Sequence, residues 1–552
     1  MKKLYILLPL FALIITSCDL ERNPYDQVAV EDLLSDPGSI EAATVGNYAL
    51  LKGDLGYSGW VDDLHRISEY AGDNISLSGG TTDDLFYLYN YQAIPTNYRT
   101  ARFWSNSYKV IVGTNVMIER IEEGVTEEED QLLGENYYLR ALVYFQMGNV
   151  FGRPYNQGPS NLSVPLKLTS ATDDIPDRNT VEEVYEQVIS DLEKAETLMN
   201  INKGASYASK QAAQALLSRV YLYKEDNNLA QEYADKVISS GEYTLLPTSE
   251  FKEMNTLRPD NNPEAIFAVT LSSESDLLGE SDNWYTIGSL YASIEGIGWG
   301  EMYASSSYLN LINKNPNDAR KAFIEPQYLE DDNGDGIPVV YWVNSQYSYE
   351  FRETTDSNGT TTFVDNGSTY TIYSETDSNG NELYFFNSSN GKQYVNKDFD
   401  LEKRNGYPKF YILKASLQED DVHMWSPTVS RLAEMYLNKA EAYAKQGADD
   451  LALEAINVLR TRAGIPEMTL SDIPSGKTVL DIVLEERRLE LAYEGHRRYD
   501  VYRNGDTMIR TYPGGHLNGT NPFYEIPSTS NRIIEFIPEQ QIILQPSLIQ
   551  NP

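Results

Sequence analysis

Apolar side chains recur every three or four positions along much of the chain, the spacing that places them on one face of an α-helix. Where this pattern persists it predicts single helices, at residues 39–51, 62–71, 104–121, 127–150 and 180–199. Two further stretches contain two helices separated by a short turn, at residues 208–224 with 229–240 and at residues 431–445 with 450–463. The pattern therefore predicts a mainly α-helical protein.

The helical pairs carry small residues where close packing of helices requires them. In the first pair, the spacing resembles that of a tetratricopeptide repeat, in which small alanines let paired helices approach closely. The residues that carry it are Ala212, Leu216, Tyr221, Ala230 and Ala234. Helical repeats of this kind bury their apolar faces only by stacking on one another. We therefore expect both halves of the chain to join one helical scaffold.

A densely charged stretch near the C-terminus, residues 479–503, is predicted to form one long helix with an apolar stripe. Glu494 precedes Arg497 and Arg498 by three and four residues, the spacing at which opposite charges pair on a helix. Arginines placed among carboxylates make bidentate pairs that fix geometry. We interpret the stretch as a core helix with buried ion pairs, and a catalytic role is the alternative.

Between the helical parts, residues 251–408 are rich in Ser, Gly, Asn and Tyr. Over residues 341–399, short runs of Thr, Tyr, Phe and Val alternate with Asn-Gly pairs that begin at Asn358, Asn366, Asn379 and Asn390. Asn-Gly between such runs signals a β-hairpin, so this part is predicted to be a β-meander inserted into the helical scaffold. Binding sites often lie on variable loops of this kind, which a rigid scaffold holds in place.

The N-terminal residues have the features of a secretory signal. Lys2 and Lys3 precede an apolar run over residues 4–15, which is too short to span a bilayer. Cys18, the single cysteine, follows small residues in a pattern that resembles the bacterial lipobox, where the cysteine is diacylated. Residues 1–17 are therefore predicted to be removed and Cys18 to carry a lipid anchor. An ordinary signal peptide with an incidental cysteine is the alternative.

The composition excludes some classes of function. The 552 residues carry a net charge of −38, whereas nucleic-acid binding requires a basic surface that displaces counterions. With 41% hydrophobic and 23% charged residues, the chain is expected to fold rather than to remain disordered. Its length exceeds that of one ordinary core, which agrees with a repeat-like helical array.

Catalytic motifs are scarce in the sequence. The four histidines, His65, His423, His496 and His516, have no metal-ligand spacing and no cysteine partner, so a zinc site is not expected. With 82 acidic residues in the chain, any pair of carboxylates is uninformative about glycosidase chemistry. The sequence thus favours a binding protein over an enzyme.

One acidic run resembles the first half of a calcium loop. Asp331, Asn333 and Asp335 place oxygen ligands at alternate positions, and Gly336 follows where a sharp turn is needed. The glutamate expected six residues after that glycine is replaced by Trp342. The run predicts either a Ca²⁺ or Mg²⁺ site, completed by a more distant carboxylate, or an ordinary acidic turn.

Aromatic residues are the stronger lead to a ligand. The chain has 41 tyrosines, 16 phenylalanines and 6 tryptophans, and flat rings stack on the apolar faces of sugars. The candidates in the loop-rich part are Trp284, Tyr285, Tyr291, Trp299 and Tyr303. Core packing is the alternative role of each, whereas Trp104 and Trp425 border predicted helices and are expected to be buried.

Several stretches together resemble one protein family. The pattern E-R-R-x-E-L-x-x-E-G-x-R-x-x-D at residues 486–500 resembles the C-terminal signature of the SusD/RagB family of nutrient-capturing outer-membrane lipoproteins. Also similar to that family are ISEYAGDN at residues 67–74, YYLRALVYFQMGNVFG at 137–152, RLAEMYLNKAEAYAKQG at 431–447 and the extended tail at 526–552.

The resemblance implies a tetratricopeptide-like scaffold with a loop-rich, partly β insertion on the ligand-binding side. It divides the chain into a signal peptide (1–17), an N-terminal helical part (18–250), the insertion (251–409) and a C-terminal helical part with its tail (410–552). Because N-terminal and central loops often line the family's pocket, Asp73, Asn74 and Tyr407 join the candidate ligand contacts.

A function is implied as well. Such a lipoprotein sits as a lid on a SusC-like TonB-dependent β-barrel transporter, binds an extracellular oligomer and delivers it inward. An oligosaccharide or polysaccharide is the expected ligand. Oligopeptide capture is the first alternative, a surface hydrolase is a more remote one, and no organic cofactor is expected.

Overall fold

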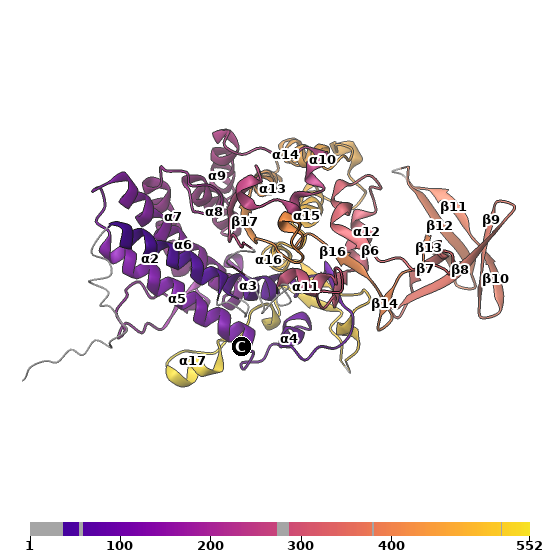
Figure 1. Cartoon of the computed structure of the whole chain (residues 1–552), viewed down its shortest axis with the longest axis horizontal. Helices are drawn as coiled ribbons and strands as arrows, with labels where there is room; N and C mark the ends of the chain where they lie inside the picture. Colours follow the sequence, from indigo (N-terminus) through magenta and orange to yellow (C-terminus); the bar gives the residue numbers. More distant parts are fainter. Residues whose placement is uncertain (1–36, 54–58, 273–275, 277–285, 378–379, 520) are drawn as a thin grey trace, which may run out of the picture.

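The computed structural model describes residues 37–53, 59–272, 276, 286–377, 380–519 and 521–552. The predicted signal segment, Cys18, Trp284, Tyr285 and Asn379 lie outside these residues. Figure 1 shows an elongated molecule, with helices over most of its length and a sheet at one end. Within the described residues, no helix is both long enough and apolar enough to cross a bilayer.

The helices predicted before residue 470 are confirmed, with their ends shifted by a few residues. They are α2 (Pro37–Lys52), α3 (Trp60–Glu69), α5 (Tyr98–Arg120), α6 (Glu127–Phe151), α7 (Val181–Leu198), α8 (Lys210–Tyr223), α9 (Asn227–Ser240), α13 (Leu432–Lys445) and α14 (Asp449–Arg462). Short helices add α4 (Leu85–Tyr89), α10 (Thr248–Phe251), α11 (Ile287–Tyr291), α12 (Ser306–Ile312) and α17 (Glu539–Leu544). Polar caps fix several starts, since Thr126 and Thr180 accept hydrogen bonds from the first turns of α6 and α7.

The two helical pairs stack in one array, as the alanine pattern predicts (Figure 1). Helix α8 packs against α9, α9 against α13, and α13 against α14, so the second pair continues the first. Ala212, Ala230 and Ala234 are fully buried between these helices. An ion pair of 2.7 Å between Lys439 and Asp235 also joins α13 to α9. Both halves of the chain therefore form one scaffold.

The charged stretch forms two helices, so the prediction of one long helix is wrong. Helices α15 (Val479–Glu490) and α16 (Arg497–Arg503) are separated by a turn in which Tyr493 and Gly495 have φ angles of 66° and 82°. The backbone N–H groups of these two residues donate to the buried carboxylate of Glu69, at 3.1 and 2.9 Å. Because the carboxylate satisfies donors that the break exposes, it stabilises the turn.

The break also redirects the ion pairs predicted within this stretch. Glu494 pairs with Arg431 at 2.9 Å instead of with the arginines that follow it. Arg497 pairs with Asp73 at 2.7 Å, and Arg498 with a carboxylate of the C-terminal tail at 2.8 Å. These mostly buried pairs connect segments far apart in the sequence, which agrees with the interpretation of the stretch as part of the structural core.

The insertion contains a seven-stranded antiparallel sheet in the order β10-β9-β8-β7-β13-β12-β11. Its strands are β7 (Pro338–Val343), β8 (Tyr349–Ser357), β9 (Thr360–Asp365), β10 (Ser368–Thr371), β11 (Tyr373–Thr376), β12 (Glu382–Ser388) and β13 (Gly391–Phe399). Asn358 and Asn366 take φ angles of 51° and 49° in tight hairpin turns, as predicted from the Asn-Gly pairs. Two meanders, β7 to β10 and β11 to β13, join where β13 pairs with β7.

The other strands pair two by two along the body. They are β1 (Ile75–Leu77) with β5 (Met302–Ala304), β2 (Leu162–Pro165) with β3 (Arg178–Thr180), β4 (Ala265–Ala268) with β17 (Thr428–Arg431), β6 (Ile324–Pro326) with β16 (Phe410–Ile412), β14 (Lys403–Arg404) with β15 (Tyr407–Pro408), and β18 (Thr507–Ile509) with β19 (Glu525–Pro527). The seven-stranded sheet has an apolar core of its own around Trp342, Phe363 and Phe386. It projects from the body as a separate lobe (Figure 1).

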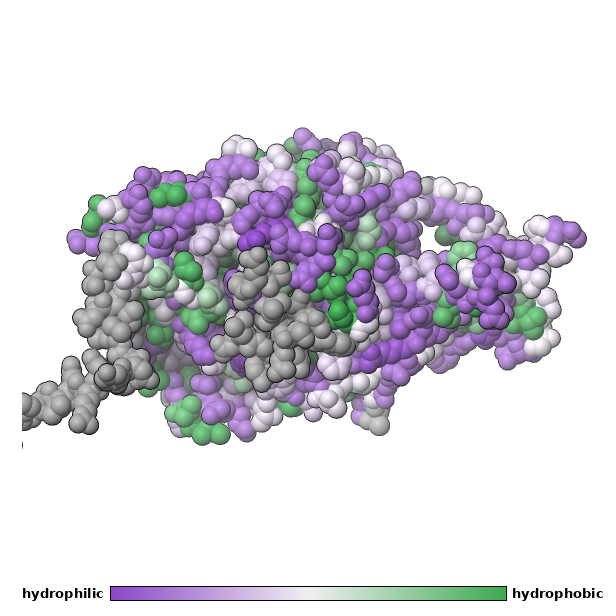
Figure 2. All heavy atoms as spheres, viewed as in Figure 1, coloured by the Kyte–Doolittle hydropathy of each residue, from purple (hydrophilic) through white to green (hydrophobic). Residues whose placement is uncertain are grey.

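The molecular surface in Figure 2 is mostly hydrophilic, in keeping with the net charge of −38. Apolar residues gather over α17, where Ile543 and Leu544 are largely exposed.

Candidate functional site

Two of the predicted aromatic contacts are buried. Residues 286–304 do not form a free loop, because α11 and β5 within them pack against the body. The hydroxyl of buried Tyr291 lies 2.8 Å from His65 Nε2, and that of buried Tyr303 donates to the Gly300 carbonyl at 2.7 Å. Of the two roles predicted for these rings, ligand contact and core packing, their burial supports core packing.

Asp73 and Asn74 are also buried and hold distant segments together. The Asp73 carboxylate accepts hydrogen bonds from Nε and Nη2 of Arg497, at 2.7 and 3.1 Å, and lies 3.4 Å from Arg488. Burial raises the pKa of Asp73, but Arg488 and Arg497 outweigh it and lower the pKa to about 2. Asn74 donates to Glu69 at 3.2 Å and accepts from Arg488 at 2.9 Å. Neither residue is turned to solvent, so this geometry supports a structural role.

Trp299 reaches the surface, with 47% of its area exposed. It follows a tight turn in which Gly298 has a φ angle of 97°, and a Cβ there would lie 2.4 Å from His423 Nε2, so the turn requires glycine. The Trp299 backbone is fixed on both sides, because its N–H donates to the Ser289 carbonyl and its carbonyl accepts from Arg404, both at 2.6 Å. The ring is thus presented on a rigid backbone.

A charged group bonds the backbone of Trp299. Arg404, in the β14–β15 hairpin, donates to the Glu301 carboxylate at 2.8 Å as well as to the Trp299 carbonyl. Burial raises the pKa of Glu301, Arg404 lowers it and the nearby charge of Asp83 raises it further. Arg404 thus connects the Trp299 backbone to the Glu301 carboxylate, and the charge of Asp83 acts on Glu301.

Asp83 connects this group to the start of α5. Its carboxylate accepts hydrogen bonds from Arg99 Nε at 2.9 Å and from the Tyr98 hydroxyl at 3.1 Å, and the Tyr98 ring is 44% exposed. Tyr407, in the same hairpin as Arg404, is half-buried against the core. We name as the Trp299 face the six residues Asp83, Tyr98, Trp299, Glu301, Arg404 and Tyr407.

The Trp299 face combines exposed rings with fixed hydrogen-bonding groups. Rings of this kind can stack on the apolar face of a sugar, while guanidinium and carboxylate groups bond its hydroxyls. No local pattern in the sequence marks Asp83 or Tyr98, because Asp83 comes from a distant segment to act on Glu301, and Tyr98 bonds Asp83. Glu301 could have been found only from its position two residues after Trp299.

The predicted metal ligands lie in an exposed turn. Asp331 Oδ1 accepts hydrogen bonds from the backbone N–H groups of Asn333 and Asp335, at 2.8 and 3.0 Å, which lowers the pKa of Asp331. The described residues contain no group of three or more His, Cys, Asp or Glu side chains placed to hold a metal ion. The predicted ligands include the side-chain amide of Asn333, which such a group does not count, so a calcium ion at this turn stays a prediction.

Known proteins resemble this chain along most of its length. The sequence profile of the SusD family matches residues 263–552, and a profile described as "Starch-binding associating with outer membrane" matches residues 62–222. A SusD-like protein of Formosa agariphila is 25% identical over 508 residues, which cover 88% of this chain and 86% of the relative. The starch-binding protein SusD of Bacteroides thetaiotaomicron is 24% identical over 493 residues, covering 85% and 82%.

Solved structures share the fold. A SusD superfamily protein from Bacteroides thetaiotaomicron has a TM-score of 0.72 and 25% identity, covering 93% of this chain and 99% of that one. A putative sugar binding protein from Bacteroides vulgatus has a TM-score of 0.67 and 23% identity, covering 93% and 98%. The helical scaffold with a sheet-containing insertion, expected from the sequence, is thereby confirmed.

Proposed function

The chain belongs to the SusD family, and we propose that it captures an extracellular oligosaccharide or polysaccharide at the outer membrane. In this proposal Cys18 carries the lipid anchor, the protein faces the cell exterior, and a SusC-like TonB-dependent barrel receives the ligand. Names of similar proteins support it, since one matching profile is described as starch-binding and outer-membrane-associated and one relative is named a starch-binding protein. The protein would act by binding and not by catalysis.

We infer a glycan ligand from the Trp299 face. Its tryptophan is 47% exposed, and Arg404 bonds both the backbone carbonyl of Trp299 and the Glu301 carboxylate. Stacking a sugar on the ring removes apolar area from both partners. If about 100 Å² is covered, the gain is about 2.5 kcal/mol. The neighbouring charged groups would then set which hydroxyls are accepted.

Calorimetry against a panel of polysaccharides tests the proposal. Trp299→Ala is expected to weaken glycan binding at least tenfold, because most of the stacking contribution is lost. Tyr373→Ala serves as the matched control, since this equally exposed ring lies on the outer strand β11 of the sheet. Glycan binding that survives Trp299→Ala combined with Trp284→Ala would rule out this site.

The oligopeptide alternative is tested in the same experiment. A peptide mixture is expected to give no heat of binding, and peptide binding in the absence of any glycan binding would favour the alternative. Incubation with oligosaccharides is expected to leave them intact, and released products would indicate a surface hydrolase.

The anchor and the partner need separate tests. Cys18→Ala is expected to release the protein from the membrane fraction, because the acyl chains supply the anchoring. Purification of the tagged wild-type chain from outer membranes is expected to recover a TonB-dependent barrel. Recovery of the chain alone would count against the proposed delivery step, though not against glycan binding.

A further inference from the structure

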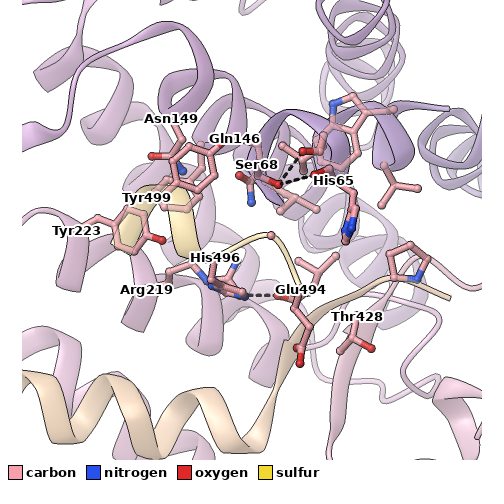
Figure 3. Close-up of a pocket in the computed structure, with 18 of the residues that line it drawn as sticks. His65, Ser68, Gln146, Asn149, Arg219, Tyr223, Thr428, Glu494, His496 and Tyr499 are labelled. Atoms are coloured by element: carbon pink, nitrogen blue, oxygen red, sulfur yellow. Dashed lines mark hydrogen bonds between the residues drawn. The ribbon is translucent and has the colours of Figure 1, made fainter. Parts of the chain in front are cut away.

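A cavity lies where the N-terminal helices meet the turn between α15 and α16 (Figure 3). Helices α3, α6 and α8 form one side of it, and residues 425–429, residues 494–496 and the start of α16 form the other. Its volume is about 60 Å³. None of the residues that line it belongs to the Trp299 face.

Several polar side chains that line this cavity form no hydrogen bond with any other residue in the described part of the chain, among them Gln146, Asn149, Thr428, His496 and Tyr499. Figure 3 shows Gln146, Thr428 and His496 arranged around the open centre. Gln146 and His496 are only 9% and 8% exposed, so they have little contact with bulk solvent. Buried polar groups in native proteins almost always have a partner, so these side chains indicate an occupant of the cavity.

The charged groups of the cavity wall are already neutralised. Glu494 lies 2.9 Å from Arg431 and 2.6 Å from Lys414, and Arg219 lies 2.6 Å from Glu434. A charged ligand would find no free counter-charge here, yet it would lose its hydration on entry. The occupant is therefore expected to be neutral.

The two histidines of the wall do not alter this balance. Burial, reinforced by neighbouring arginines, lowers the pKa of His65 and of His496 to about 3, although Glu494 opposes the shift. Both rings are therefore uncharged at neutral pH. A neutral imidazole presents one donor and one acceptor, which suits a ligand whose groups both donate and accept.

Aromatic rings complete the wall. Phe145, Tyr223 and Trp425 line the same space as these polar side chains. Rings beside a few placed hydrogen-bonding groups are the usual composition of a small-molecule pocket. Water would bond the polar groups and leave the rings without apolar contacts, whereas a polyol offers C–H groups to the rings and hydroxyls to the polar side chains.

We propose that this cavity binds one small neutral polyol of about the size of erythritol. The cavity volume of about 60 Å³ corresponds to roughly four to six water molecules. A four-carbon polyol fits this volume, and its hydroxyls can bond several of the side chains that lack a partner. The site is independent of glycan capture at the Trp299 face and does not rest on that proposal.

Erythritol binding to the mature chain tests the proposal, by titration with ligand-observed NMR and by soaking crystals. Electron density for one erythritol in contact with Gln146 and Thr428 is the expected result. Gln146→Met and Thr428→Val keep the side-chain shape and remove one hydrogen bond each, so each is expected to weaken erythritol binding about three- to tenfold. Tyr373→Ala, on the distant sheet, is the control that should change nothing.

A counter-ligand tests the predicted neutrality. Tartrate has the same four-carbon chain as erythritol but two negative charges, and it is expected not to bind. Polysaccharide binding measured on Gln146→Met and Thr428→Val separates this site from the Trp299 face and should equal that of the wild type. Density for ordered water only, tartrate binding as tight as erythritol binding, or erythritol binding that both variants leave unchanged would each overturn the proposal.

Discussion

Removing the charge of Asp73 tests whether this residue, in the segment that joins α3 to β1, stabilises the fold and does not bind the ligand. Asp73→Asn keeps the shape of the side chain but removes the carboxylate that pairs with Arg497 and Arg488. We expect the variant to fold, to be less stable at neutral pH, and to bind glycan with unchanged affinity per folded molecule. If Asp73 instead contacted the ligand, the substitution would also lower the affinity for glycan.

The size of the effect follows from the pKa of Asp73. Folding lowers this pKa from its ordinary value of 3.8 to about 2, because two arginines hold the ionised form. A shift of nearly two units corresponds to roughly 2.4 kcal/mol of stability. With an unfolding entropy of about 2.1 cal/mol/K per residue, the melting temperature should fall by about 2 °C.

The effect has a defined pH dependence. A carboxyl group whose pKa is lowered by folding stabilises the protein above its unfolded pKa, and loses that contribution as the pH falls through the folded value. The difference in stability between the wild type and Asp73→Asn should therefore be full at neutral pH, shrink below 3.8 and vanish near 2.

Urea unfolding followed by circular dichroism, at neutral and at acid pH, measures this difference. Asp173→Asn removes an exposed carboxylate and is the control with no expected change. Arg497→Ala removes the other partner and should likewise lower the melting temperature more than it lowers glycan affinity. Unchanged stability of Asp73→Asn at neutral pH, together with lost glycan binding, would refute the reasoning.

Three further predictions concern other parts of the molecule. Gly495→Ala should lower the melting temperature more than Gly505→Ala. Both glycines have a positive φ angle (82° and 76°), but a Cβ on Gly495 would also lie 2.7 Å from Ser68 Oγ. Equal losses of melting temperature in the two variants would contradict this close approach. Phe386→Ala, in the separate core of the sheet, should cost about 3–5 kcal/mol and speed amide hydrogen exchange in the strands of that lobe while the helices stay protected. Loss of protection in the helices as well would show that the two parts unfold together. If the acidic turn holds calcium, added Ca²⁺ should raise the melting temperature of the wild type and not that of Asp331→Ala; no shift in the wild type, or the same shift in both, would count against a site there.

The helices of the scaffold were predictable because their signals are local. Apolar spacing, small residues and caps such as Thr126 and Thr180 all lie within a few positions of the helix that they specify. The break before α16 has no such signal. The carboxylate that satisfies Tyr493 belongs to Glu69, 424 positions earlier in the chain, so the turn becomes favourable only in the folded structure.

The candidate site was less predictable because burial is not a local property. Tyr291 and Trp299 lie in the same glycine-rich stretch, yet the first is fully buried and the second is 47% exposed. The difference arises because α11 carries Tyr291 against the ring of Tyr70, and Gly298 turns the chain outward before Trp299. The sequence around Trp299 therefore predicts aromatic side chains in a glycine-rich segment, but it carries no local signal that separates the exposed ring from its buried neighbours.

The bonds between Glu69 and the turn before α16 also affect when the protein can fold. A buried carboxylate without partners is costly, and two of the donors to Glu69 are supplied by Tyr493 and Gly495, late in the chain. Helix α3 therefore cannot complete its packing until that late segment is available. Contacts over such sequence distances also slow folding. For a chain with a predicted secretory signal, the surroundings of Glu69 would therefore be completed only after residues 493–495 have emerged.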